Sequence, residues 1–249
     1  MVSFKKYSMA LLLCLLAAGL FGCGAQEGEE AAPAEDLAEP SDQETAGWDP
    51  VTVTASGKGE ICFSLSPQDF IQRYNVLFRA DWGEDMLPPL DQWMDYGVGE
   101  LSLSGGATGH QYLSLMDESN YAEPFLSLCV TQDGKGVIET VTGLSQKNYE
   151  DGPQNLFRKK TLYSLRVFFP ALEEAAFETL YQGLFQGGQY AGAGEEALPT
   201  RIFYQDGVAC YGVLQIGEYD EIHVRAVDEA QLDQWKAAGV EVVEGICGQ

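Results

Sequence analysis

The sequence predicts an α+β domain over residues 48–249, with an antiparallel sheet that carries two or three helices on one face. Three observations support this prediction. Apolar residues alternate with polar ones in several short segments, amphipathic runs with helical spacing separate these segments, and Asp-Gly pairs mark tight turns. The apolar and aromatic contents, 45% and 11%, are those of a protein that buries a core.

The first elements of the domain are two strands and a helix. Period-two alternation predicts the strands over residues 51–54 and 61–65. Ser66 then provides a helix cap, Pro67 occupies the first helical position, and an apolar stripe continues to about Arg79. This segment has the complete pattern of an amphipathic helix.

The segment after this helix, residues 81–97, is predicted to be a long irregular connection, because Pro88-Pro89 interrupts any continuous helix. Long irregular loops are often functional, and aromatic rings beside acids suit a sugar or a cationic ligand. The candidate ligand-binding residues are Asp81, Trp82, Asp85, Trp93 and Tyr96. The alternative is that apolar side chains only close the end of the core: Trp82, Leu87, Leu90 and Trp93.

A block of strands is predicted next, over residues 98–104, 110–116, 124–131 and 137–142. A glycine-containing turn at residues 132–136 joins the last two of them. Residues 143–160 are polar and predict a loop, in which the basic cluster Arg158-Lys159-Lys160 is a solvated segment leading into a helix.

The last part of the chain predicts helices and then strands. Apolar stripes predict helices over residues 162–169 and 172–185, and strands follow over residues 201–204 and 208–216 on either side of a type I′ turn at Asp206-Gly207. The remaining elements are a strand at 221–227, a short helix capped by Asp228 and a strand at 240–246. A helix followed by strands with a Gln-Asp-Gly turn thus occurs twice, which leaves open whether the domain consists of two similar halves.

The chain begins with the pattern of an export signal. Lys5 and Lys6 precede an apolar run over residues 9–21, which as a helix would span about 20 Å of a hydrocarbon core that is roughly 30 Å thick. A basic start and a short apolar run are typical of a cleaved secretory signal. The stretch Leu20-Phe21-Gly22-Cys23 resembles the lipobox of bacterial lipoproteins, although Phe21 stands where that family usually has a small residue.

The resemblance to bacterial lipoproteins covers only residues 1–23. It implies that residues 1–22 are a signal peptide that is removed, and that Cys23 becomes the lipidated N-terminus with a diacylglyceryl group. Two acyl chains give stable anchoring. The expected location is therefore the cell membrane, with the domain on its extracytoplasmic side; an unlipidated secreted protein is the alternative.

An acidic tether is expected between the anchor and the domain. The segment from Cys23 to residue 47 has eight acids, no base and one large apolar residue, Leu37. Such a segment buries too little apolar surface to offset the entropy of ordering, so we predict that it is disordered. Its 24 residues after the cysteine would reach about 25–30 Å as a flexible chain.

The net charge of the chain restricts the classes of partner that it can bind. The 38 acids and 14 bases give a net charge of −24, and residues 48–249 alone, with 30 acids and 12 bases, carry −18. So negative a domain repels phosphate backbones, which excludes nucleic acid as a partner. The expected partners are the membrane, through the acyl chains on Cys23, and a cell-wall component, a small molecule or another envelope protein. The sequence does not indicate an oligomeric state.

The sequence predicts no catalytic residue, metal site or cofactor. His110 and His223 each lie in a predicted strand without a neighbouring His or Cys at metal-ligand spacing, and common hydrolase and phosphate-binding motifs are absent from the sequence. Cysteines 62, 129, 210 and 247 form disulfides or are buried thiols. We therefore expect a non-enzymatic binding module; the alternatives are an envelope hydrolase whose site combines distant residues, or an inhibitory or structural module.

Overall fold

The computed structural model describes residues 47–100, 108–114, 124–145, 151–184, 199–214 and 219–246. The lipobox, Cys23 and nearly all of the acidic tether lie outside these residues, so their predicted roles rest on the sequence. Within the described ranges, no helix combines the length and the apolar character that crossing a bilayer requires.

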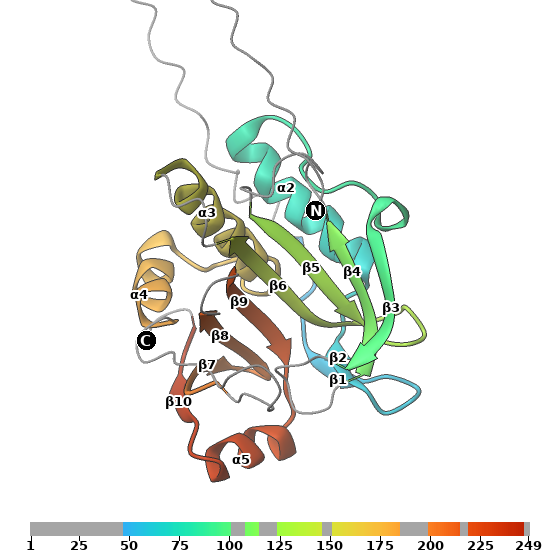
Figure 1. Cartoon of the computed structure of the whole chain (residues 1–249), viewed down its shortest axis with the longest axis vertical. Helices are drawn as coiled ribbons and strands as arrows, with labels where there is room; N and C mark the ends of the chain where they lie inside the picture. The colour runs from blue at the N-terminus through green and yellow to red at the C-terminus, as the bar shows by residue number, and fades with distance from the viewer. Residues whose placement is uncertain are drawn as a thin grey trace, which may run out of the picture. The chain divides into compact units, whose positions relative to one another are not determined.

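A mostly antiparallel sheet of eight strands forms the centre of the domain and confirms the α+β prediction (Figure 1). The strand order is β10-β7-β8-β9-β6-β5-β4-β3, and β10 pairs parallel with β7. Its strands are β3 (Met94–Glu100), β4 (Thr108–Ser114), β5 (Phe125–Val130), β6 (Val137–Ser145), β7 (Arg201–Gln205), β8 (Val208–Leu214), β9 (Tyr219–Ala226) and β10 (Glu241–Glu244). A separate hairpin pairs β1 (Val53–Ala55) with β2 (Ile61–Phe63).

The two faces of the sheet carry different helices. The helices are α2 (Pro67–Trp82), the 3-10 turn η1 (Leu90–Gln92), α3 (Asp151–Phe168), α4 (Glu174–Leu184) and α5 (Glu229–Ala237). Apolar residues of α2, α3 and α4 pack in one large core against Val208 and Cys210 of β8, whereas α5 packs in a second core against Ala209 and Tyr211. Because successive strand residues point to opposite faces, three helices cover one face and α5 covers the other.

The first long helix begins where the sequence predicts. The Ser66 hydroxyl accepts the Asp69 N–H at 3.1 Å, and Pro67 is the first helical residue. The helix runs almost one turn beyond the predicted Arg79 and ends at Gly83, whose φ of 78° is left-handed. Because β3 also begins as early as Met94, the predicted connection over residues 81–97 is shorter than expected.

The prediction of a loop over residues 143–160 is wrong for residues 143–145 and 151–160, while residues 146–150 lie outside the described part of the chain. Strand β6 continues to Ser145, and α3 begins at Asp151. Pro153 lies in the first turn of α3, where a missing N–H breaks no hydrogen bond of the helix. Lys160 is buried and donates to the Pro124 carbonyl at 2.5 Å, so this member of the basic cluster is not solvated.

The two Gln-Asp-Gly segments form hairpin turns. Asp206 and Gly207 have φ values of 49° and 84°, both positive, which confirms the type I′ turn between β7 and β8. Gly134, with a φ of 72°, lies in the turn between β5 and β6. Counted along the chain, the turn at Gly134 joins the third and fourth strands of the sheet, and the turn at Asp206-Gly207 joins the fifth and sixth. The similarity of two halves stays a prediction.

Three of the four cysteines of the domain are buried free thiols. Cys62 and Cys129 pack in one small apolar cluster, and Cys210 lies in the core beneath the three helices. Burial raises the pKa of the Cys129 thiol to about 12. The buried-thiol alternative is confirmed for these three, and Cys247 lies outside the described residues.

Candidate ligand-binding pocket

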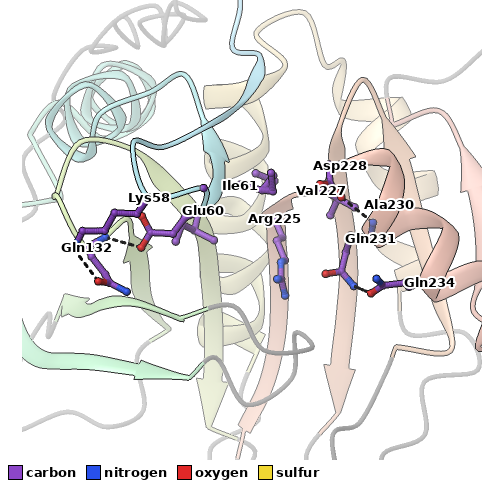
Figure 2. Close-up of a pocket in the computed structure, with 13 residues that line it drawn as sticks. Lys58, Glu60, Ile61, Gln132, Arg225, Val227, Asp228, Ala230, Gln231 and Gln234 are labelled. Atoms are coloured by element: carbon purple, nitrogen blue, oxygen red, sulfur yellow. Dashed lines mark hydrogen bonds between the residues drawn. The ribbon is translucent and has the colours of Figure 1, made fainter.

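A pocket of about 440 Å³ opens on the α5 side of the sheet (Figure 2). This volume is in the range of small-molecule sites. Its lining comes from three parts of the chain that are far apart in sequence: Lys58, Gly59, Glu60 and Ile61 of the β1–β2 hairpin, Gln132 and Ile138 of the β5–β6 hairpin, and Arg225, Ala226, Val227, Asp228, Ala230, Gln231 and Gln234, which run from the end of β9 into α5. We call it the hairpin–α5 pocket.

The first wall of the pocket is held together by hydrogen bonds between the hairpin and the β5–β6 turn. One oxygen of the Glu60 carboxylate accepts the Gln132 N–H at 3.0 Å, and the other accepts the Ser56 hydroxyl at 2.6 Å. The Lys58 ammonium donates to the side-chain oxygen of Gln132 at 2.9 Å. Glu60 therefore connects the hairpin to the β5–β6 turn, while Lys58 places a cation at the edge of this wall.

The second wall is the beginning of α5. Asp228 caps this helix, because its Oδ1 accepts the Gln231 N–H at 2.8 Å. The Gln231 amide nitrogen lies 3.5 Å from the Gln234 side-chain oxygen, at the limit of a hydrogen bond. Two loosely paired amides and a carboxylate thus face the pocket from this side.

Arg225 lies between the two walls (Figure 2) and is only 4% exposed. Its strand position is directly opposite Glu139 of β6 and Ala209 of β8. The Arg225 Cζ is 5.9 Å from the centre of the Trp235 ring, within the range of a cation–π contact. Contacts from the sheet and from α5 therefore fix a guanidinium group at the pocket.

A buried ionic cluster lies next to Arg225 on the same face of the sheet. Glu139 Oε1 accepts the Tyr211 hydroxyl at 2.8 Å and lies 3.1 Å from His223 Nδ1. The other ring nitrogen, Nε2, lies 3.3 Å from Glu221 Oε2. The Tyr211 ring stacks on the His223 ring at 4.9 Å, with the planes 4° apart.

The pKa values of this cluster favour its charged form. Burial opposes the charge of Glu139, but the charge and hydrogen bond of His223, with Arg225 and Tyr211, outweigh burial and lower the Glu139 pKa. Burial likewise lowers the pKa of His223, but Glu139 and Glu221 raise it to about 9. At neutral pH the imidazolium lies between two carboxylates, and neither nitrogen is free to accept a proton.

The second histidine also has a carboxylate partner. His110 Nε2 lies 2.5 Å from Asp95 Oδ1, and the His110 ring stacks on Tyr112 at 4.8 Å. The Gly97 N–H and His110 together lower the pKa of Asp95. The fold creates the His223–Glu139 and His110–Asp95 pairs, because each joins residues that are distant in sequence and no local motif predicts them.

The candidate set from the 81–97 segment is divided in the structure. Asp81 and Trp82 both contact Tyr163: the Trp82 indole donates to the Tyr163 hydroxyl at 3.3 Å, and that hydroxyl donates to Asp81. Asp85 pairs with Arg79.

The other aromatic residues of the set have different environments. Trp93 is 6% exposed and donates to the Pro88 carbonyl at 2.9 Å, and Leu87 is also buried, so these two residues close the core as the alternative expected. Trp82 does not close it, since it is 54% exposed. Tyr96 is 60% exposed on β3, the edge strand. A ligand role for the set stays a prediction.

The pocket residues were not predicted from the sequence. Glu221, His223 and Arg225 alternate with apolar residues along β9, and such alternation ordinarily indicates a solvated face. In the fold, α5 packs on this face, and residues 58–61 of the hairpin line the pocket beside Arg225. The informative signal is three ionisable residues on one strand face, with the acid Glu139 in a neighbouring apolar strand.

The comparisons with known proteins add no functional assignment to the geometry of the site. In the described part of the chain, no group of three or more His, Cys, Asp or Glu side chains is placed to hold a metal ion. Comparison of the chain with protein-family models, with curated proteins and with solved structures found no match.

Proposed function

We propose that this chain is a lipid-anchored bacterial surface protein whose α+β domain binds a small polar ligand in the hairpin–α5 pocket, without catalysing a reaction. The lipobox-like sequence at Cys23 and the acidic segment after it support the anchor and its extracytoplasmic location. The negative domain supports a partner other than nucleic acid.

The observation that carries the binding proposal is the construction of the pocket. Hydrogen bonds that Glu60 accepts and Lys58 donates fix one wall, and the Asp228 cap fixes the other. A site whose walls are already ordered loses little entropy when a ligand enters. Buried ionic groups such as Glu139 and Arg225 cost stability, and proteins keep such groups at functional sites.

Binding is favoured over catalysis by the state of the histidines. A general base needs a free ring nitrogen at the working pH. Both nitrogens of His223 face carboxylates, and its side chain is 6% exposed. His110, with a side chain 27% exposed beside Asp95, is the observation that favours the hydrolase alternative. If His110→Ala abolished a measured hydrolase activity, that alternative would replace the present proposal.

A steric block tests the pocket. Ala230 is an exposed residue of α5 that lines the pocket, and Ala237 is an exposed residue at the end of the same helix outside the lining. We would measure thermal shifts with a panel of amino acids, dicarboxylates, polyamines and monosaccharides. At least one probe should stabilise the wild type and Ala237→Trp but not Ala230→Trp. Equal shifts in all three proteins for every probe, or no shifts, would refute binding in this pocket.

The anchor has a separate test. Cys23→Ser removes the thiol that would be acylated, so the protein should move from the membrane fraction to the soluble fraction of the source cell. Unchanged partitioning of Cys23→Ser would show that the anchor is wrong while leaving the pocket proposal in place.

A further inference from the structure

We infer that the ligand of the hairpin–α5 pocket is a small zwitterion, namely a free α-amino acid or a short peptide with both ends charged. This inference rests on the proposed function. It follows from three properties of the pocket: the balance of its charges, their placement on opposite walls, and the chemistry of its uncharged lining.

The charges of the lining are balanced in a domain that is otherwise strongly negative. Residues 48–249 carry a net charge of −18, but the pocket has two cations, Lys58 and Arg225, and two anions, Glu60 and Asp228. The field of the domain repels a ligand that is only anionic. A zwitterion has no net charge, so it meets no long-range repulsion and still contacts groups of both signs.

Lys58 is the cation that would bind a ligand carboxylate. It has three donor protons, and its hydrogen bond at 2.9 Å goes to the neutral Gln132 amide. Arg225 is buried opposite Glu139 and adds positive charge to the lining. In Figure 2, Arg225 lies between the wall that carries Lys58 and the wall that carries Asp228. A ligand carboxylate would therefore bind Lys58, on the side of its wall that faces Arg225.

The two anions are not equivalent. Both oxygens of Glu60 accept hydrogen bonds from its own wall, from the Gln132 N–H and the Ser56 hydroxyl. Asp228 uses Oδ1 to cap α5, and a carboxylate has further acceptor sites on its second oxygen. Asp228 is thus the group for a ligand ammonium, on the wall opposite Lys58 (Figure 2).

The uncharged lining favours an amide over a sugar. Gln132, Gln231 and Gln234 provide amide groups, and the contact between the last two is long enough to exchange for a ligand. The described lining contains no aromatic side chain on which a sugar ring would stack. Peptide-like donors and acceptors match these glutamines, and small aliphatic groups match Ile61 and Ile138.

Calorimetric titration with L-alanine, L-alanyl-L-alanine and two blocked forms of the dipeptide tests the inference. N-acetylation removes the ammonium, and C-amidation removes the carboxylate. Each block should weaken binding by at least about tenfold, because each removes one charge-assisted interaction. Comparing L-alanine with the dipeptide shows whether the amino acid or the peptide is the better ligand. Equal affinity for the free and either blocked dipeptide would overturn the inference.

Two substitutions assign the charges. Asp228→Asn keeps a good helix cap but removes the charge, so it should weaken binding of the free dipeptide about tenfold and leave the N-acetylated form unchanged. Lys58→Met should weaken the free dipeptide and leave the amidated form unchanged. Lys236 is an exposed lysine of α5 outside the lining, so Lys236→Met is the control. Equal effects of Asp228→Asn on both dipeptides would contradict the role of Asp228.

The failure of this inference is distinct from that of the proposed function. If neither L-alanine nor the dipeptide binds, but another probe binds in a way that Ala230→Trp blocks, the ligand class is wrong and the pocket remains a binding site. If no probe responds to Ala230→Trp, both proposals are wrong.

Discussion

The two faces of the central sheet are built by opposite means. The face under α2, α3 and α4 is an apolar core that includes Phe70, Leu165 and Phe177. The face under α5 combines a smaller apolar core with buried ionic groups, among them Glu139 and Arg225. Apolar packing is the more effective stabiliser, since buried charges contribute little net stability. The comparison indicates that the first face stabilises the fold, while the second carries the pocket that we propose as the binding site.

The largest effect is expected on the three-helix face. Phe70 is fully buried in the core, so Phe70→Ala should lower the free energy of unfolding by about 3–5 kcal/mol, without changing its dependence on pH. Denaturant titration at several pH values measures both quantities. Gln72→Ala, at an exposed position of the same helix, should change little. A loss below about 1 kcal/mol for Phe70→Ala would contradict the structural role of this face.

The ionic cluster should make the stability depend on pH. The folded-state pKa of His223 is about 9 against an ordinary 6.5, so its contribution is complete below pH 6.5 and is lost as the pH rises through 9. The shift corresponds to about 3 kcal/mol. The pKa of Glu139 is lowered, so its contribution is present above its ordinary value of 4.5 and is lost as the pH falls through the lowered value.

The control for this pH dependence is Glu139→Gln, which removes the main group that raises the His223 pKa. Its free energy of unfolding should vary less than that of the wild type between pH 6 and pH 10 and should be lower at neutral pH. A His223 titration near its ordinary pKa in the wild type, followed by NMR, would show that the cluster is not coupled in this way.

A smaller effect is expected at the start of α5. Asp228→Ala removes the helix cap and should cost about 1 kcal/mol, whereas Asp228→Asn should cost only a few tenths. Thermal unfolding of the two variants measures the difference. If both variants lost the same stability, the charge of Asp228 and not its cap would stabilise the helix.

The smallest effect on stability should accompany the largest effect on binding. Ala230→Trp changes an exposed side chain, so the free energy of unfolding should stay within about 0.5 kcal/mol of the wild type. The same substitution should abolish ligand binding, because the indole fills the pocket. A variant that is strongly destabilised would show that the pocket is already closed by packing.

The sequence predicted the fold better than the site, and the reason is physical. Period-two alternation, the Ser66 cap and the Asp206-Gly207 turn are local signals, and each was confirmed. The start of α3 was missed because its first turns are polar. The ionic cluster joins Glu139 to His223 across two strands, and only the fold determines that pairing.

The aromatic segment shows the same limit. Its composition suggested a ligand site, but composition does not distinguish a side chain that enters the core from one that stays outside. Trp93 is buried in the core, whereas Tyr96 stays exposed. The hairpin–α5 pocket, in contrast, uses glutamines and a buried arginine that have no characteristic spacing in the sequence.

The most direct test is to follow the tryptophan indole N–H signals by NMR during titration with L-alanyl-L-alanine. Trp235 packs against Arg225, and its indole N–H has no hydrogen-bond partner among the described residues. Trp93 donates to the Pro88 carbonyl in the core on the other face. The account predicts a saturable shift of the Trp235 signal while the Trp93 signal stays unchanged. A shift of Trp93 with Trp235 unchanged, or no shift at all, would contradict it.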